Sequence, residues 1–441
     1  MRPSLKRNII RNLASPYALA MFSFCVFLFA WVFPPDVYTD FIHEPNLMFL
    51  NLPTLGFYAS CVAAFMLGLR SVRFFGYPKP PEKLPRITAR MPLLYLSTPL
   101  FISTVLCGVF LIKLGGHIDF VAMLSSGQGE MIKRAMGGDT EGNWSSALYL
   151  LSAVLWWAYF RANQLELQGF TKVVFYLSFT GALGVDIVTC VATVDRTNLL
   201  PVIAGLFLIY IFFKTRAEKV NIARLALISG GGGVSVIGAF LALSFLRGAS
   251  AGKLMIASLM GYTVVSYNRL AALVTGVMHY AYEGRAEYLL PLLVRNDRLN
   301  TIIPMRDWFG WPDLLVQMES EFNAVLAAGL NPNYNWAGYF GYIYSDLAWW
   351  TPVYAFLLGA FAGIFWLRFC EGKTDGIVMY MWNAFSILFW VGGNWIFSEK
   401  IVRTAVSAVL LVIYDRFSLR FLADRPAAET IPAATLRERA I

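Results

Sequence analysis

Long runs of apolar residues, separated by short polar segments rich in Lys and Arg, are the dominant pattern along this chain. Several runs approach or exceed the roughly 18 residues that a transmembrane helix needs, and few of them carry a charge. A β-barrel would instead show segments of about ten alternating residues. The pattern predicts an all-α, polytopic membrane helix bundle with about ten spans, at residues 15–33, 50–69, 91–114, 145–161, 172–193, 199–213, 225–246, 351–368, 377–395 and 401–415.

The predicted spans divide the chain into four parts, with a large loop between spans seven and eight. Within this loop, residues 254–278 are apolar except for Arg269, which is compatible with partial embedding in the membrane. The parts are residues 1–246 with spans one to seven, 247–350 with the large loop and short helices, 351–415 with spans eight to ten, and 416–441 with a polar tail.

Composition and charge agree with a membrane location. Hydrophobic residues make up 58% of the chain and charged residues 14%, whereas soluble proteins carry about a quarter charged residues. The net charge of +9 comes from basic residues in short loops beside the spans, so no nucleic-acid partner is expected. These residues are concentrated on the side of the N-terminus, which predicts that both termini are cytoplasmic and that the large loop lies on the opposite side of the membrane. The five cysteines lie in or at the edge of spans, without disulfide or zinc spacing.

Three arginines are candidates for an anion site at the depth of the lipid headgroups. Arg196 follows a very short connection between two spans, Arg247 closes span seven at the same membrane face, and Arg269 lies in the apolar part of the loop. Each could simply be an arginine that extends from a helix end toward water. Together they favour a site for a lipid-linked diphosphate, because arginine binds phosphate through two parallel hydrogen bonds.

Amides and aromatic residues are concentrated in the segment 331–346. Sugars bind to such combinations through hydrogen bonds to amides and packing of C–H faces on aromatic rings. An aromatic belt at the membrane surface would explain the rings but not the asparagines. The predicted glycan-binding residues are Asn333, Asn335, Trp336, Tyr339 and Tyr344.

Acid–base candidates also lie in the loop. Gln317 and Glu321 are one helical turn apart, and either Glu321 or Glu319 could be the base of an inverting glycosyl transfer. His279 could titrate near neutral pH, although a lone histidine is more often structural.

Spans five to eight resemble the Wzy-type polymerases of oligosaccharide repeat units, which build bacterial surface polysaccharides. The resemblance covers about residues 170–370 and is carried by Asp195-Arg-Thr-Asn-Leu-Leu200, by the segment 333–346, and by the small-residue run Leu357-Leu-Gly-Ala-Phe-Ala-Gly363. Ala348-Trp-Trp350 departs from the family, which has glycine soon after the position of Asp346.

The resemblance implies a glycosyltransferase that joins undecaprenyl-diphosphate-linked oligosaccharides into an O-antigen, capsule or exopolysaccharide. The resemblance implies no nucleotide sugar, no cofactor and no metal, and it implies a bacterial inner-membrane protein with the large loop in the periplasm. The residues fit such a reaction independently: the arginines would hold the leaving diphosphate, and Glu321, His279 or Asp346 would accept the proton of the acceptor. Membrane lipids surround the protein, and a chain-length regulator and a flippase are compatible protein partners. The alternatives are an O-antigen ligase-like transferase and a glycolipid flippase or other transporter, although ionisable residues at the membrane midplane are few.

Overall fold

The computed structural model contains helices and no strand in the part of the chain that it describes. It describes residues 12–74, 84, 87, 91–115, 146–193, 196–216, 227, 230–231, 238, 257, 259–261, 263–289, 291, 297–312, 314–393 and 398–422. The helices are α2 (Pro16–Trp31), α3 (Pro35–Ile42), α4 (Leu52–Ser71), α5 (Pro92–Gly115), α9 (Ser146–Gln164), α10 (Gly169–Ala192), α11 (Arg196–Arg216), α14 (Val264–Val274), α16 (Asp297–Ile302), α17 (Met305–Phe309), α18 (Leu314–Ala327), α19 (Gly338–Leu347), the 3₁₀ helix η1 (Ala348–Trp350), α20 (Thr351–Cys370), α21 (Thr374–Leu388) and α22 (Glu399–Leu422).

The predicted all-α class is confirmed for these residues, and each predicted span coincides with a helix except 225–246, which lies almost entirely outside them. Among the described residues, fewer helices than the ten predicted spans are long and apolar enough to cross a membrane by length and composition. The bent pair α2 and α3, with 90° between its helices, is a further candidate, while α21 has only 15 residues. The five single candidates are Leu52–Ser71, Pro92–Lys113, Gly169–Ala192, Asn198–Arg216 and Gly338–Cys370.

Local sequence explains where two of the long helices begin. Ser15 caps α2, and its hydroxyl accepts a hydrogen bond from the Ala18 amide at 3.4 Å. Pro16 follows at the first helical position, where a backbone amide has no acceptor within the helix. Asn51 caps α4 in the same way, with its side-chain oxygen 3.0 Å from the Thr54 amide. Both caps satisfy backbone donors that would otherwise lack partners at a helix start.

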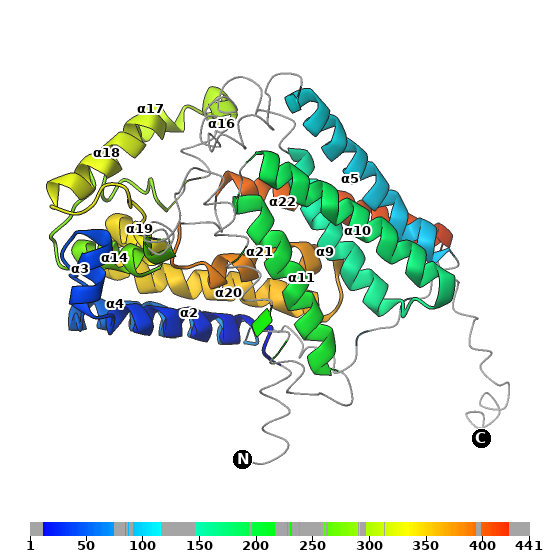
Figure 1. Ribbon diagram of the computed structural model, residues 1–441, viewed down its shortest axis with the longest axis horizontal. Helices are drawn as coiled ribbons and strands as arrows, with labels where there is room; N and C mark the ends of the chain where they lie inside the picture. The colour runs from blue at the N-terminus through cyan, green and yellow to red at the C-terminus, as the bar shows by residue number, and fades with distance from the viewer. Residues whose placement is uncertain are drawn as a thin grey trace, which may run out of the picture.

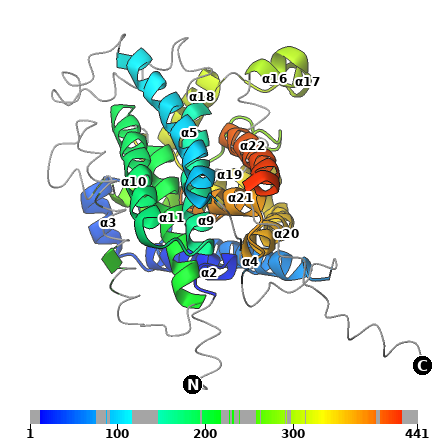
Figure 2. The same cartoon turned by 90° about the vertical axis from the view of Figure 1, so that its right-hand side faces the viewer.

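Two glycines allow α4 and α20 to pack backbone against backbone. A Cβ atom on Gly68 would lie 1.9 Å from the carbonyl oxygen of Phe356, and one on Gly359 would lie 2.0 Å from that of Phe65. Small residues at a crossing allow such close approach between membrane helices. The two helices lie side by side in both views (Figures 1 and 2).

A second group of helices surrounds α9, which packs against α5, α10, α11, α21 and α22. At one end of this group, Arg161 of α9 forms an ion pair of 2.6 Å with Asp415 of α22. The Arg161 guanidinium also donates to the Thr374 hydroxyl and the Gly372 carbonyl, and Tyr95 of α5 donates to Asp415. One buried ion pair therefore ties together α5, α9, α22 and the start of α21.

Helix α14 is buried inside the protein. All ten residues from Val264 to Leu273 are buried, and the helix packs against α2, α4 and α19. Packing inside the protein is therefore enough to explain why the sequence around Arg269 is apolar, and no contact with lipid is needed to explain it. Figure 1 shows α3, α14, α18 and α19 at one end of the molecule, where α2 ends and α4 and α20 begin.

Candidate functional site

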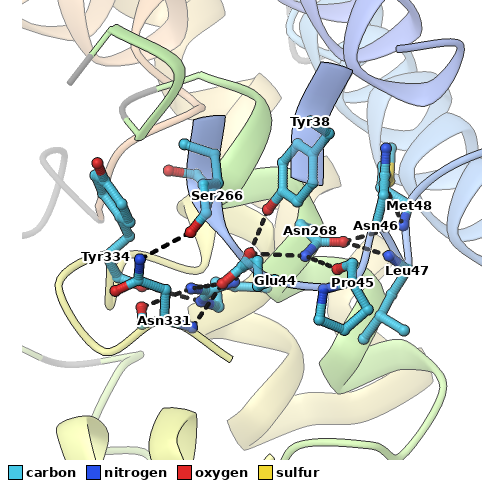
Figure 3. Close-up of polar contacts among 12 residues, drawn as sticks. Tyr38, Glu44, Pro45, Asn46, Leu47, Met48, Ser266, Asn268, Asn331 and Tyr334 are labelled. Carbon is cyan, nitrogen blue, oxygen red and sulfur yellow. Dashed lines mark hydrogen bonds and ion pairs between the residues drawn. The ribbon is translucent and has the colours of Figure 1, made fainter. Parts of the chain in front are cut away.

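Arg269 and Glu44 form the centre of a buried polar network at this end of the molecule. Figure 3 shows Glu44 in this network with Tyr38, Asn268 and Asn331 around it. The two guanidinium nitrogens Nη1 and Nη2 lie 2.6 and 2.7 Å from the two carboxylate oxygens, and both side chains are 0% exposed. Arg269 Nε donates to the Tyr334 carbonyl, and Nη2 donates to the Asn331 carbonyl, both at 2.9 Å. A paired charge with this many hydrogen bonds can remain ionised in the interior.

The Glu44 carboxylate receives further donors from three other residues. The backbone amide of Asn331 donates at 2.6 Å, the Asn268 side chain donates at 3.0 Å, and the Tyr38 hydroxyl also donates. Asn268 in turn accepts the backbone amides of Leu47 and Met48. The network therefore fastens the loop after α3 and the turn at Asn331 to helix α14.

This arrangement gives Arg269 a positioning role. Its guanidinium is occupied by Glu44 and two carbonyls, and its side chain has no exposed surface. The diphosphate-binding role of Arg269 stays a prediction, and binding at this residue would have to displace Glu44. Sequence reasoning did not single out Glu44. The available signal was a segment, residues 34–49, that holds three acids and no Lys or Arg, opposite a lone arginine in an apolar stretch.

Three tyrosines form a second cluster beside this network. The rings of Tyr280 and Tyr288 have centroids 5.2 Å apart, Tyr288 and Tyr342 are separated by 5.3 Å, and Tyr280 and Tyr342 by 6.1 Å. All three side chains are buried, and they pack with Val325 of α18 and Leu330 in one apolar cluster. Tyr342 comes from α19, so the cluster joins three separate segments of the predicted loop.

Helix α18 brings Glu321 to the tyrosine cluster. Gln317, Glu321 and Val325 are successive residues on its buried face, and Glu321 is 4% exposed, whereas Glu319 points outward and is exposed. Burial, followed by the Glu321 charge, raises the pKa of the Tyr288 hydroxyl far above its usual range. Burial, followed by Tyr342 and then Glu321, likewise raises the pKa of Tyr280. The prediction that Gln317 and Glu321 lie on the same side of the helix is confirmed. The raised pKa values keep the phenols of Tyr280 and Tyr288 protonated, so both are potential hydrogen-bond donors.

Asp346, at the end of α19, holds the backbone that carries Tyr288. One of its carboxylate oxygens accepts the Leu289 amide at 2.7 Å. In the described part of the chain, the other oxygen is buried without a hydrogen bond. Asp346 thus holds the backbone beside Tyr288, and, after burial, the Glu321 charge acts on the same residue by raising the pKa of the Tyr288 phenol. The structure brings these two predicted acid–base residues to one cluster.

His279 lies outside this cluster. Its side chain is 67% exposed, and Nδ1 is 3.2 Å from Glu283 one turn later. A catalytic role for His279 stays a prediction, and it would require substrate to reach a different surface from that of Glu321.

The predicted glycan-binding residues are spread over several environments. Asn333 is exposed, while Asn335 is half-buried and its carbonyl accepts the Tyr342 hydroxyl at 3.4 Å. The Trp336 ring is half-buried and packs edge-on against Phe389, at 6.2 Å. Asn333 and Asn335 therefore lie a few residues before Tyr342 of the tyrosine cluster in the chain. Asn333 faces solvent, and Asn335 is partly exposed to it.

The two predicted glycan-binding tyrosines of α19 differ in exposure. Tyr344 is half-buried and packs edge-on against Phe57, with ring centroids 4.9 Å apart. Tyr339 is 0% exposed, and its hydroxyl donates to Tyr354 at 3.1 Å. Tyr339 therefore acts in the core of this structure, and its predicted contact with glycan stays a prediction.

The remaining anion-site candidates are not fully described. Arg196 begins α11, as the sequence predicts for a residue opening a span, but its side chain lies outside the described part. Arg247 lies outside it altogether. Among the described residues, no group of three or more His, Cys, Asp or Glu side chains is placed to hold a metal ion.

Comparison with known proteins finds no matching protein family, no matching curated protein and no matching solved structure. The chemistry open to this chain is therefore inferred from its own residues and contacts.

Proposed function

We propose that the protein polymerises undecaprenyl-diphosphate-linked oligosaccharide repeat units into a surface polysaccharide at the periplasmic face of the bacterial inner membrane. The observation that carries the proposal is the Glu321 carboxylate, buried against the tyrosine cluster of Tyr280, Tyr288 and Tyr342. A carboxylate beside aromatic rings with hydroxyl groups is the combination that glycosyl transfer and sugar binding need. The sequence resemblance to Wzy-type polymerases supports the same reaction.

In the proposed reaction, an acceptor hydroxyl oxygen attacks the anomeric carbon at the reducing end of the donor glycan. The bond from that carbon to the diphosphate oxygen breaks, and undecaprenyl diphosphate leaves with the electron pair. Glu321 takes the proton of the acceptor hydroxyl. Arg196 and Arg247 are the predicted ligands for the negative charge that develops on the diphosphate.

The remaining residues of the site have supporting roles in this proposal. The hydroxyl groups of the tyrosine cluster hydrogen-bond sugar hydroxyls, and Asn333, Asn335 and Tyr344 contact the growing glycan near the surface. Asp346 positions Tyr288 through the backbone amide of Leu289. The Glu44–Arg269 pair fixes the turn at Asn331 beside the cluster.

The experiment compares Glu321→Gln with Glu319→Gln in purified protein supplied with lipid-linked repeat units and no nucleotide sugar. These residues are two positions apart on α18, and one is buried while the other is exposed. Loss of the base should slow elongation by about 10²- to 10⁴-fold for Glu321→Gln, and Glu319→Gln should elongate at the wild-type rate. Full elongation by Glu321→Gln would refute Glu321 as the base.

The same variants in cells separate the proposed function from its alternatives. A polymerase without its base should leave single repeat units attached to the lipid A core, or no exopolysaccharide. Loss of all attached glycan while free polymer persists would instead indicate a ligase-like transferase. Accumulation of unpolymerised lipid-linked repeats on the cytoplasmic side would indicate a flippase.

A further inference from the structure

A cavity of about 230 Å³ lies at the start of α2, away from the tyrosine cluster. The end of α4 and the second half of α20 complete it, and these three helices lie along one edge of the molecule (Figure 1). Its lining residues are Asn12, Ser15, Tyr17, Leu69, Arg73, Gly363, Trp366 and Leu367.

The cavity has an apolar floor and a polar mouth. Leu69, Trp366 and Leu367 are buried at 5 to 7% exposure, whereas Tyr17 and Arg73 are exposed. An occupant that matches both regions must carry hydrocarbon at one end and a polar group at the other. A small hydrophilic ion would leave the indole and leucine surfaces without a partner.

Positive charge at the mouth selects the sign of that polar group. Arg73 lines the cavity, and Arg70 lies one turn earlier at the end of α4. No carboxylate lines the cavity among the described residues. Arginine binds phosphate through its planar set of donors, and such pairs are stronger beside an apolar surface than in water.

The membrane is the source of amphiphiles closest to this cavity. Leu69 belongs to α4, one of the helices long and apolar enough to cross a membrane, and Arg73 follows the end of that helix. Basic residues at the cytoplasmic end of a span attract the anionic lipids of that leaflet. The sequence places Arg70 and Arg73 in such a basic segment.

We propose that this cavity binds one anionic phospholipid, with its phosphate at Arg73 and part of an acyl chain against Leu69, Trp366 and Leu367. The site is independent of the glycosyl-transfer proposal, because it uses none of the residues assigned to the reaction. It would fasten the start of α2 to the crossing of α4 and α20.

The test measures lipid retained by the full-length protein in native mass spectrometry after release from nanodiscs. The nanodiscs contain equal parts of phosphatidylglycerol and phosphatidylcholine, and the wild type should retain phosphatidylglycerol preferentially. Arg73→Gln should lower that retention about tenfold, as expected for the loss of one charge-assisted hydrogen bond. The matched control is Lys172→Gln, which removes an exposed charge from the start of α10, outside the cavity.

A second variant tests the apolar floor. Leu367→Trp should fill the cavity and reduce phosphatidylglycerol retention while leaving Arg73 in place. Equal retention by the wild type and Arg73→Gln would overturn the proposal. Displacement of the lipid by millimolar inorganic phosphate would also overturn it, because it would identify a site for soluble phosphate.

Discussion

Glu44 and Arg269 lie 225 residues apart in the chain and meet as a buried ion pair through both carboxylate oxygens and both terminal guanidinium nitrogens. The pair joins three segments that are distant from one another in the chain: the loop after α3, helix α14 and the turn at Asn331. Each of these charges alone would be costly to bury, and as a pair they hold the three segments in place beside the tyrosine cluster.

Breaking this pair from one side should destabilise the protein more than removing both charges. Arg269→Met leaves Glu44 buried and unpaired, so we expect the free energy of unfolding to fall by about 3–5 kcal/mol. The double variant Glu44→Gln with Arg269→Met leaves no net charge and should recover part of that loss. Thermal unfolding of the purified protein in detergent measures both. A double variant that is no more stable than Arg269→Met would contradict the pairing.

Two ion pairs between different helices, Arg161–Asp415 and Arg368–Asp375, should differ in importance because they differ in burial. The Arg161 and Asp415 side chains are 5% and 7% exposed, and those of Arg368 and Asp375 are 33% and 27% exposed. Arg161→Met should lower the free energy of unfolding by about 3–5 kcal/mol, and Arg368→Met by about 1 kcal/mol or less. Chemical unfolding of each variant measures the difference. Equal losses would show that burial does not govern these pairs.

Two glycines of α4 provide a direct test of the close crossing with α20. A Cβ atom on Gly68 would lie 1.9 Å from the Phe356 carbonyl oxygen, whereas one on Gly56 would have nothing within 4 Å. Gly68→Ala should therefore force the helices apart and cost about 1–3 kcal/mol. Gly56→Ala should leave stability unchanged or raise it by up to about 1 kcal/mol, because alanine favours the helix. The unfolding temperatures of the two variants provide the comparison, and a stable Gly68→Ala would contradict the crossing.

Hydrophobic runs were sufficient to predict the helical class and the positions of the long helices, because each run must be buried in protein or lipid whatever its partners are. They could not distinguish these two environments. The apolar stretch around Arg269 is compatible with membrane embedding by sequence alone, whereas residues 264–273 within it form the part of α14 that is buried inside the protein. Ten spans were predicted on the same basis, and among the described residues five or six helices meet the length and composition of a span.

The candidate site was predictable where local periodicity determines direction. The spacing of Gln317 and Glu321 placed them on one helix face, and that face is buried. Pairings between distant segments gave no such local signal. Nothing in the sequence around Tyr280 or Tyr288 indicates that both rings meet Tyr342, and nothing around Tyr339 separates it from the half-buried Tyr344.

Tyr280 provides a test that separates a binding role from a structural one. Its hydroxyl is buried and has no hydrogen-bond partner in the described part of the chain, an arrangement that costs about 1–3 kcal/mol. Tyr280→Phe should therefore preserve or raise stability. Elongation of lipid-linked repeats should fall about tenfold, because the glycan loses a hydrogen bond at the tyrosine cluster.

The matched control is Tyr380→Phe in α21, whose hydroxyl donates to the Ala14 carbonyl in the core and has no part in the proposed glycan site. This variant should lose about 1 kcal/mol of stability and elongate normally once folded. Measuring thermal unfolding and elongation on the same preparations separates the two effects. A destabilised Tyr280→Phe with normal elongation would assign its hydroxyl to folding, and the tyrosine cluster would then lose its proposed role in binding sugar.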